Sequence, residues 1–260
     1  MKELYKQLKP ERVFYYFERI SDIPRGSRDT TKISEYIESI GLSLGLDTYR
    51  DELGNVIIKK EATAGKENIP GVILQGHMDM VCEKNADVEH DFTKDPIKVI
   101  YDGEYIHAGG TTLGADDGIA VAMALALLED DDLPHPALEV LITTDEEVGM
   151  LGAAAFDPKL ISARLLLNID SEIEGVFTVG CAGGVKTHSH IPVEYEKNTA
   201  PAYLVSISGL QGGHSGIEIH KERGNANKLI LRIYDMLKAD FSDLAIAEVF
   251  GGAKDNAMPR

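Results

Sequence analysis

Three short apolar runs, each leading directly into acidic residues, constrain the fold of this chain more than any other feature of its sequence. They cover residues 72–75, 138–144 and 164–170, and they are rich in leucine, isoleucine and valine. Runs of this length and composition indicate buried strands, and strands buried on both faces are typical of parallel sheets. We therefore predict an α/β fold with a mainly parallel, mixed sheet flanked by helices.

Ionisable side chains stand at the end of every one of these runs. They are His77 and Asp79 after the first run, Asp145, Glu146 and Glu147 after the second, and Asp170 at the end of the third. In open α/β sheets ligands bind outside the carboxyl ends of the strands, so we expect these side chains to share one site. One histidine and several carboxylates suit a divalent cation. The sequence therefore predicts a metal centre at this edge of the sheet.

His77 and Asp79 are two residues apart, so in an extended chain their side chains point to the same side. An oxygen of Asp79 can then accept the second ring N–H of His77, which is how a metal-ligating histidine is usually oriented. A single pair of this kind also occurs at many ordinary strand ends. Only its recurrence with the other acidic strand ends favours a metal role.

Asp116 and Asp117 precede an apolar segment, residues 119–128, that we predict to be a helix packed against the sheet. Carboxylates at a helix N-terminus are stabilised by the helix dipole whether or not they bind a ligand. A structural explanation for this pair therefore stays open beside a ligand role. A solvated turn is the corresponding alternative for Glu146 and Glu147.

The remaining pattern indicates two domains, residues 1–182 and 183–260. In the first we expect helices at 10–20 and 33–44, a strand at 55–59 and an irregular segment at 91–110. After a glycine-rich segment at 180–184 we expect strands at 185–193, 203–207 and 246–250 and a helix at 225–237. Strands followed by a helix and another strand are typical of part of an α+β domain.

The net charge of −17 supports the same division, because residues 183–260 hold nine basic and nine acidic residues whereas residues 1–182 hold 17 basic and 34 acidic ones. Acidic surfaces argue against a nucleic-acid partner. No apolar stretch approaches the roughly 18 residues of a membrane span, and the N-terminus lacks the apolar region of a signal peptide. We expect a cytoplasmic protein without membrane contact. Cys82 and Cys181 indicate neither a disulfide framework nor a thiolate zinc site.

His214 lies in a glycine-rich loop, where packing gives little reason for an imidazole. Function concentrates in such loops, so we consider His214 a candidate functional residue. His188 and His190 alternate along a predicted strand and could pair on a metal, although surface histidines are far commoner.

Six motifs carry a resemblance to a known family. They are GHMDMVCEK from residue 76, TTLGADDG from 111, TTDEEVGMLGA from 143, NIDSE from 168, GGHSG from 212 and NAMPR from 256. Together they run through essentially the whole chain and resemble the aminoacyl-histidine dipeptidases, a branch of the di-zinc exopeptidases. The resemblance implies a catalytic α/β domain interrupted by a lid domain that also forms a homodimer.

The resemblance also implies a role for each matching residue. His77 and Asp170 would bind one Zn²⁺, Asp116 would bridge to a second, Glu147 would bind the second, Glu146 would be the general base, Asp79 would orient His77, and His214 would act from the partner subunit. Co²⁺ or Mn²⁺ are possible substitutes, and the substrates would be unblocked dipeptides, preferentially of the Xaa-His type. Alternatives are another di-zinc exopeptidase or amidohydrolase, such as a tripeptidase or carboxypeptidase, or an incomplete fragment that acts only as a dimerisation module.

Two departures from the family pattern qualify these expectations. Asp117 stands where the family has asparagine, which adds a negative charge beside the bridging carboxylate. The family also takes the last ligand of its second zinc, a histidine, from a segment after the lid. No such match exists among His90, His107, His135 and His220. We therefore expect this chain to be an N-terminal portion of the enzyme.

Overall fold

The computed structural model describes residues 3–171, 173–180, 183, 185, 187–216, 218–252 and 257–260. The chain divides into two compact units, Met1–Gly183 and Gly184–Arg260. Cys181 and part of the glycine-rich segment at 180–184 lie outside the described residues.

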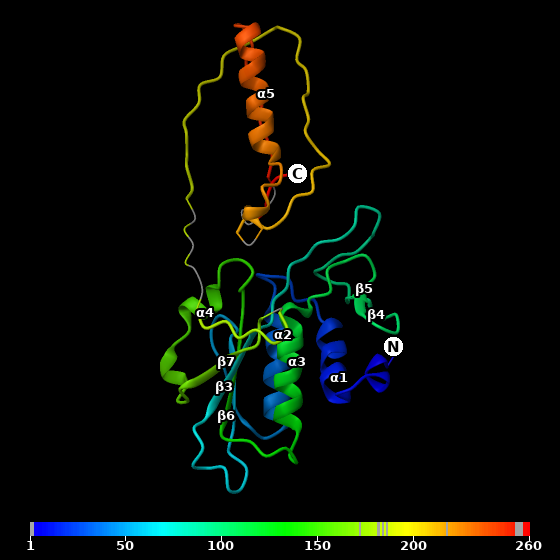
Figure 1. Ribbon diagram of the computed structural model, residues 1–260. Coiled ribbons are helices and arrows are strands. Elements are labelled where there is room, and N and C mark those ends of the chain that lie inside the picture. Colours follow the sequence, from blue (N-terminus) through cyan, green and yellow to red (C-terminus); the bar gives the residue numbers. More distant parts are fainter. Residues whose placement is uncertain are drawn as a thin grey trace. The chain divides into compact units, whose positions relative to one another are not determined.

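The first unit is built on a five-stranded sheet in the order β1-β2-β6-β3-β7 (Figure 1). The strands are β1 Asp47–Arg50, β2 Val56–Lys60, β3 Val72–His77, β6 Leu138–Thr143 and β7 Leu165–Asn168. Strand β3 pairs in parallel with both β6 and β7, whereas β2 pairs antiparallel with β6 and with β1. The predicted α/β fold with a mixed sheet is therefore confirmed.

Three helices cover one face of this sheet: α2 Thr31–Ser43 and α3 Ala115–Glu129 pack against the strands, and α1 Glu11–Ser21 packs against α3. Their buried apolar side chains, such as Ile37 and Leu125, join Val140 of β6 in the main core. The neighbouring strand residue Leu141 points to the other face and packs in a smaller cluster against Phe156 and the segment that follows it. Alternate residues of β3 and β6 are therefore buried on opposite faces of the sheet, as their apolar runs predict. The third run is not buried as expected, because β7 lies at the edge of the sheet and Leu165, Leu166 and Leu167 are 51–52% exposed.

Several short elements complete the first unit. They are the 3-10 helices η1 Leu4–Gln7 and η2 Pro158–Leu160, the helix α4 Leu151–Ala155, and the hairpin of β4 Val99–Tyr101 and β5 Ile106–Ala108. The hairpin lies within the segment expected to be irregular, and β1 was not predicted. Three- and four-residue strands offer too little alternation for a sequence pattern to indicate them.

The second unit contains the helix α5 Ala226–Asp240, close to its predicted range, and the 3-10 helix η3 Ile219–Lys221. The side chain of Asn225 caps α5 by accepting the backbone N–H of Lys228 at 3.1 Å. The predicted strands at 185–193, 203–207 and 246–250 are not formed in the residues that the structure describes. Their apolar side chains are exposed, 80% for Ile191 and 87% for Tyr203. A strand needs a hydrogen-bonding partner, and alternation alone does not provide one.

Among the described residues, no helix combines the length and the apolar character needed to cross a lipid bilayer.

Candidate metal centre

The three predicted strand ends meet at one edge of the sheet. His77 is the last residue of β3, the strand between β6 and β7, and it pairs in register with Thr143. The backbone continues this pairing beyond the strands, because Met78 N donates to Thr143 O at 2.9 Å and Ile169 N donates to Gln75 O at 3.0 Å. The parallel direction of the three strands therefore brings the acidic residues after β6 and β7 to either side of His77.

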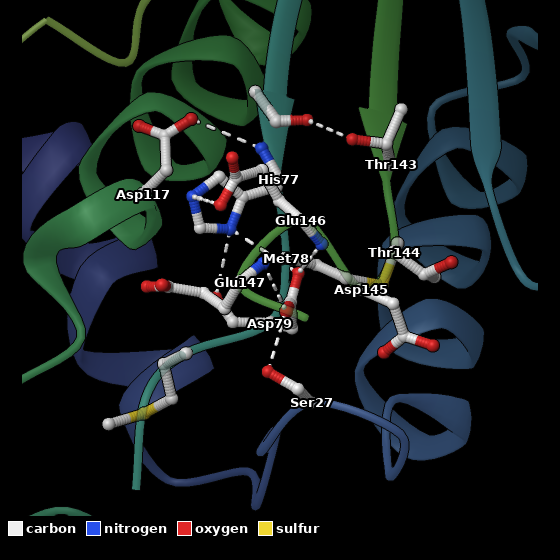
Figure 2. A network of polar contacts seen from close by, with 12 residues as sticks. Ser27, His77, Met78, Asp79, Asp117, Thr143, Thr144, Asp145, Glu146 and Glu147 are labelled. Atoms are coloured by element: carbon white, nitrogen blue, oxygen red, sulfur yellow. Dashed lines mark hydrogen bonds and ion pairs between the residues drawn. The ribbon is translucent and has the colours of Figure 1, made fainter. Parts of the chain in front are cut away.

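The imidazole of His77 is the centre of this group, and only 1% of the residue is exposed. Its Nδ1 lies 3.3 Å from Oδ1 of Asp79. Its Nε2 faces the other way, 3.1 Å from Oδ1 of Asp116, 3.8 Å from Oδ1 of Asp170 and 3.9 Å from Oε2 of Glu146. Figure 2 shows Asp79, Glu146 and Glu147 gathered around the ring. One ring nitrogen is thus held by Asp79 while the other faces carboxylates.

Asp79 is completely buried and joins three loops. Besides facing His77, its carboxylate accepts hydrogen bonds from Ser27 Oγ at 2.8 Å, from Glu146 N at 3.0 Å and from Glu147 N at 3.4 Å. Burial alone would raise the pKa of Asp79, but the hydrogen bonds from His77, Ser27 and Glu146 outweigh it and lower the pKa. Asp79 is therefore an ionised anchor for the loop that carries Glu146 and Glu147.

Asp116 and Asp117 have different partners at the start of α3. Both have non-helical backbone angles, so the regular helix begins after them. Asp116 faces His77 Nε2, whereas Asp117 is buried and accepts the backbone N–H of His77 at 3.1 Å. A Cβ at position 76 would lie 2.5 Å from Oδ2 of Asp117, which explains the glycine there.

Burial first, and then repulsion by Asp170, raise the pKa of Asp117 to about 8. This shift favours the uncharged form of Asp117, which is close in shape to the asparagine of the family pattern.

The described residues contain two groups whose ligand atoms all lie within 4.8 Å of one another: His77 with Asp116 and Asp170, and His77 with Glu146 and Glu147. Burial raises the pKa of Asp170 to about 6 and that of Glu147 to about 7. Repulsion by Asp116 also raises both pKa values, and attraction by His77 lowers them. Carboxylates crowded in this way repel one another, and a cation relieves the repulsion. One imidazole with several carboxylates is also a donor set that zinc accepts. The residues present therefore fit a divalent metal.

A search against family models gives the decisive comparison, because the model described as peptidase family M20/M25/M40 matches residues 73–242. The chain belongs to peptidase family M20/M25/M40. The resemblance to a peptidase family inferred from the motifs is thereby confirmed.

Comparisons with individual proteins support the assignment of the chain to this family. The cytosol non-specific dipeptidase of Escherichia coli K12 is 45% identical over 262 residues, which cover 100% of this chain and 54% of that protein. The crystal structure of aminoacylhistidine dipeptidase from Vibrio alginolyticus is 42% identical with a TM-score of 0.69 and the same coverage of 100% and 54%. A tripeptidase from Staphylococcus aureus, 19% identical with a TM-score of 0.53 over 96% of this chain and 63% of that one, shows the fold alone. The chain thus spans about half the length of the first two proteins.

His214 belongs to the second unit of the M20/M25/M40 chain and is exposed there. Its loop is held by its own neighbours, because His214 N donates to Oε2 of Glu218 at 3.1 Å and Arg223 Nη1 donates to Gly212 O at 2.7 Å. Gly216 N donates to the ring Nδ1 of His214 at 3.0 Å. The backbone therefore fixes the ring in one orientation.

The sequence interpretation missed the loop between α1 and α2, in which Arg25, Ser27 and Arg28 contact residues around the candidate metal centre. Ser27 bonds Asp79, and the backbone N–H of Arg28 donates to Oδ1 of Asp145 at 2.6 Å. The only signal in the sequence is a short segment with proline, glycine and serine after a helix. Such a segment indicates a turn and says nothing of its neighbours in space.

Proposed function

We propose that this chain carries the catalytic centre of a metal-dependent dipeptidase that hydrolyses unblocked dipeptides, preferentially of the Xaa-His type, with two zinc ions. The observation that carries the proposal is the gathering of two carboxylate pairs around the imidazole of His77, from the ends of β6 and β7 and from the start of α3. Metal-assisted hydrolysis requires this combination of a preformed ligand set and a nearby carboxylate able to accept a proton.

The names of the relatives support dipeptides as the substrate class. The Escherichia coli protein is called a non-specific dipeptidase and the Vibrio alginolyticus protein an aminoacylhistidine dipeptidase. The two names agree on substrate length and differ in side-chain preference. The preference for Xaa-His is therefore the finer part of the proposal and needs its own assay.

We assign His77, Asp116 and Asp170 to one ion and Glu147 to the second, with Asp116 between them. Bound divalent ions would polarise the scissile carbonyl and acidify a water molecule. Glu146 then accepts the proton of the attacking water and passes it to the leaving amine. Burial raises the pKa of Glu146, which moves this group toward the range in which a general base works near neutral pH. Asp79 holds the ring of His77 and the backbone N–H of Glu146.

We assign residues 183–260 to a lid that forms a homodimer and delivers His214 to the partner's centre. Because Gly216 N–H donates to Nδ1, a neutral His214 carries its proton on Nε2 and can donate it to a developing oxyanion. The exposure of His214 supports a role toward something outside its own loop.

The test is an assay of the zinc-loaded chain on Ala-His, Ala-Ala, Ala-Ala-His and N-acetyl-Ala-His, with free amino acid measured as product. The proposal expects release from the unblocked dipeptides, with Ala-His the best substrate, and loss of activity after chelation. Equal cleavage of the N-acetylated substrate would point to another amidohydrolase, and preference for the tripeptide to a tripeptidase. Absence of hydrolysis of any unblocked dipeptide would contradict catalysis by this chain and would favour the alternative of an incomplete fragment that acts only as a dimerisation module.

A further inference from the structure

Arg25, in the loop between α1 and α2, is one of the most deeply buried side chains of the first unit, with 2% exposure. Its Nη1 donates to Met78 O at 3.0 Å and to Asp79 O at 3.4 Å. Its Nη2 donates to Gly114 O. One guanidinium thus joins the segment that follows His77 to the segment that leads into Asp116.

The main chain of the same loop strengthens this connection. Met80 N donates to Arg25 O at 3.1 Å, and Gly26 forms a parallel β-bridge with Met80. Ser27, two residues further on, donates to the carboxylate of Asp79. The loop therefore docks on residues 78–80 through both backbone and side chains.

The start of α3 leaves space for the guanidinium. A Cβ at position 114 would lie 2.5 Å from Nη2 of Arg25, and a Cβ at position 118 would lie 2.6 Å from the same atom. Real Cβ atoms do not approach so closely, so any side chain at Gly118 would displace Arg25. Both glycines flank Asp116, and the position of the guanidinium is therefore coupled to the backbone that carries this carboxylate.

The charge of Arg25 is attracted by the carboxylates of Asp79, Asp117 and Asp116, but only at a distance. Burial lowers the pKa of Arg25 to about 10, which leaves it protonated at neutral pH. Among the described residues its guanidinium makes no ion pair within 4.0 Å, and its hydrogen-bond acceptors are backbone carbonyls. The fixed positive charge of this guanidinium repels any metal cation that binds nearby. What a metal site can use is the rigid fork of donors, which holds several carbonyls in fixed relative positions.

We propose that Arg25 is a positioning residue that sets the metal affinity of the centre by fixing the segments of Asp79 and Asp116 relative to His77. The inference rests on the proposed function only in that the centre binds a divalent ion. Arg25 would thus influence the binding of the metal ion without contacting either the ion or the substrate.

The experiment compares zinc affinity, by competition with a chromophoric chelator, for the 260-residue chain and for Arg25→Met, Arg25→Lys, Gly118→Ala and the double variant Arg25→Met with Gly118→Ala. Loss of outer contacts to metal ligands typically weakens binding by about 10- to 100-fold, and we expect this for Arg25→Met. Arg25→Lys keeps the charge but not the fork, so it should also bind at least several-fold more weakly. Gly118→Ala should weaken binding alone and add little in the double variant, since both changes act through the guanidinium.

Two further measurements separate positioning from general destabilisation. The visible absorption of the cobalt-loaded chain at saturation should change in Arg25→Lys and Gly118→Ala, because displaced ligands alter the coordination. The matched control is Glu139→Gln. Glu139 is also buried, at the far end of β6, and accepts hydrogen bonds from Ser162 and Ala163. This variant should lose stability to urea yet keep the zinc affinity and the cobalt spectrum of the unchanged chain.

Equal or tighter zinc binding by Arg25→Met overturns the inference, because it would show that charge repulsion outweighs positioning. If that variant fails to fold, unchanged affinity and an unchanged cobalt spectrum in both Arg25→Lys and Gly118→Ala overturn it instead. Failure of the unchanged chain to bind zinc at all would overturn the proposed function, and the role of Arg25 with it. Binding by the unchanged chain with no effect of the variants would overturn the role of Arg25 alone.

Discussion

Replacement of Asp79 by asparagine tests how far one buried carboxylate organises the centre. The two oxygens of Asp79 accept hydrogen bonds from Ser27 Oγ, Glu146 N and Glu147 N and face Nδ1 of His77. The amide of Asp79→Asn keeps one acceptor oxygen and turns an NH₂ group toward donors on the other side. The variant therefore removes the charge from every contact and leaves at least one buried donor without an acceptor.

The size of the effect follows from these contacts. Hydrogen bonds to a charged group contribute about 1.5–3 kcal/mol each, and an unsatisfied buried donor costs about 1–3 kcal/mol. Because the hydroxyl of Ser27 can rotate to accept and the bond from Glu147 N is long, we expect the free energy of unfolding to fall by about 2–4 kcal/mol in total. Zinc affinity should fall by about 10- to 100-fold, since Nδ1 of His77 loses the charged oxygen of Asp79 and keeps only the backbone carbonyl of the same residue, at 3.1 Å.

The assay is urea unfolding of the metal-free chain together with zinc competition, with Asp51→Asn as the matched control. Asp51 also accepts three hydrogen bonds, from Leu53 N, Asn55 N and Asn55 Nδ2, but bonds to none of the proposed ligands. The control should lose stability and keep zinc affinity.

The pH dependence gives a second check on Asp79. The pKa of Asp79 is lowered in the folded chain, so its stabilisation is complete above the unfolded pKa of about 4 and is lost as the pH falls through the folded value. The difference in stability between the unchanged chain and Asp79→Asn should therefore narrow toward acidic pH. A variant with unchanged stability and unchanged zinc affinity at pH 7 would refute the anchoring role.

Three further predictions concern the proposed ligands and base and the loop that carries His214. In the complete enzyme, Glu146→Gln should keep metal and lose turnover by a factor of about 10² to 10⁴, whereas Glu147→Gln should also lose metal; retention of metal and activity by both variants would refute these roles. After dialysis the chain should hold about one zinc tightly, because His77, Asp116 and Asp170 form a three-ligand set with room for water, whereas only Asp116 and Glu147 are assigned to the second ion; two tightly held ions by elemental analysis would contradict this. Glu218→Gln should accelerate hydrogen exchange at the amide of His214 several-fold, relative to a Glu222→Gln control, because the bond from His214 N to Glu218 is weakened. Hydrogen bonds from Lys221 first, and then from the backbone of His214 and from Arg223, lower the pKa of Glu218 to about 2. In the unchanged chain the protection of the His214 amide should therefore persist until the pH approaches this value. Equal exchange in both variants would show that Glu218 does not hold the loop.

The sequence by itself determined the α/β class and the residues gathered at the edge of the sheet. Apolar runs indicate strands, and parallel strands end at a common edge, so His77, Glu146 and Asp170 were predictable as neighbours from the sequence. The same runs did not predict the exposure of the leucines of β7, which lies at the edge of the sheet. The pair at the start of α3 was predictable as a pair, but not the division of partners between Asp116 and Asp117. That division depends on backbone angles at the start of α3 that no helix pattern indicates.

Only the tertiary structure decided what holds these residues in place. The bonds from Arg25 to Met78 and Gly114 join positions 53 and 89 residues apart, and neither partner contributes more than a backbone carbonyl, which every residue type offers. The same reason explains the strands wrongly expected in the second unit. Alternation reports which side chains suit a strand, whereas a strand exists only when a distant segment supplies hydrogen bonds. Local patterns therefore determined the chemistry of the centre, and contacts between distant backbone segments determined its geometry.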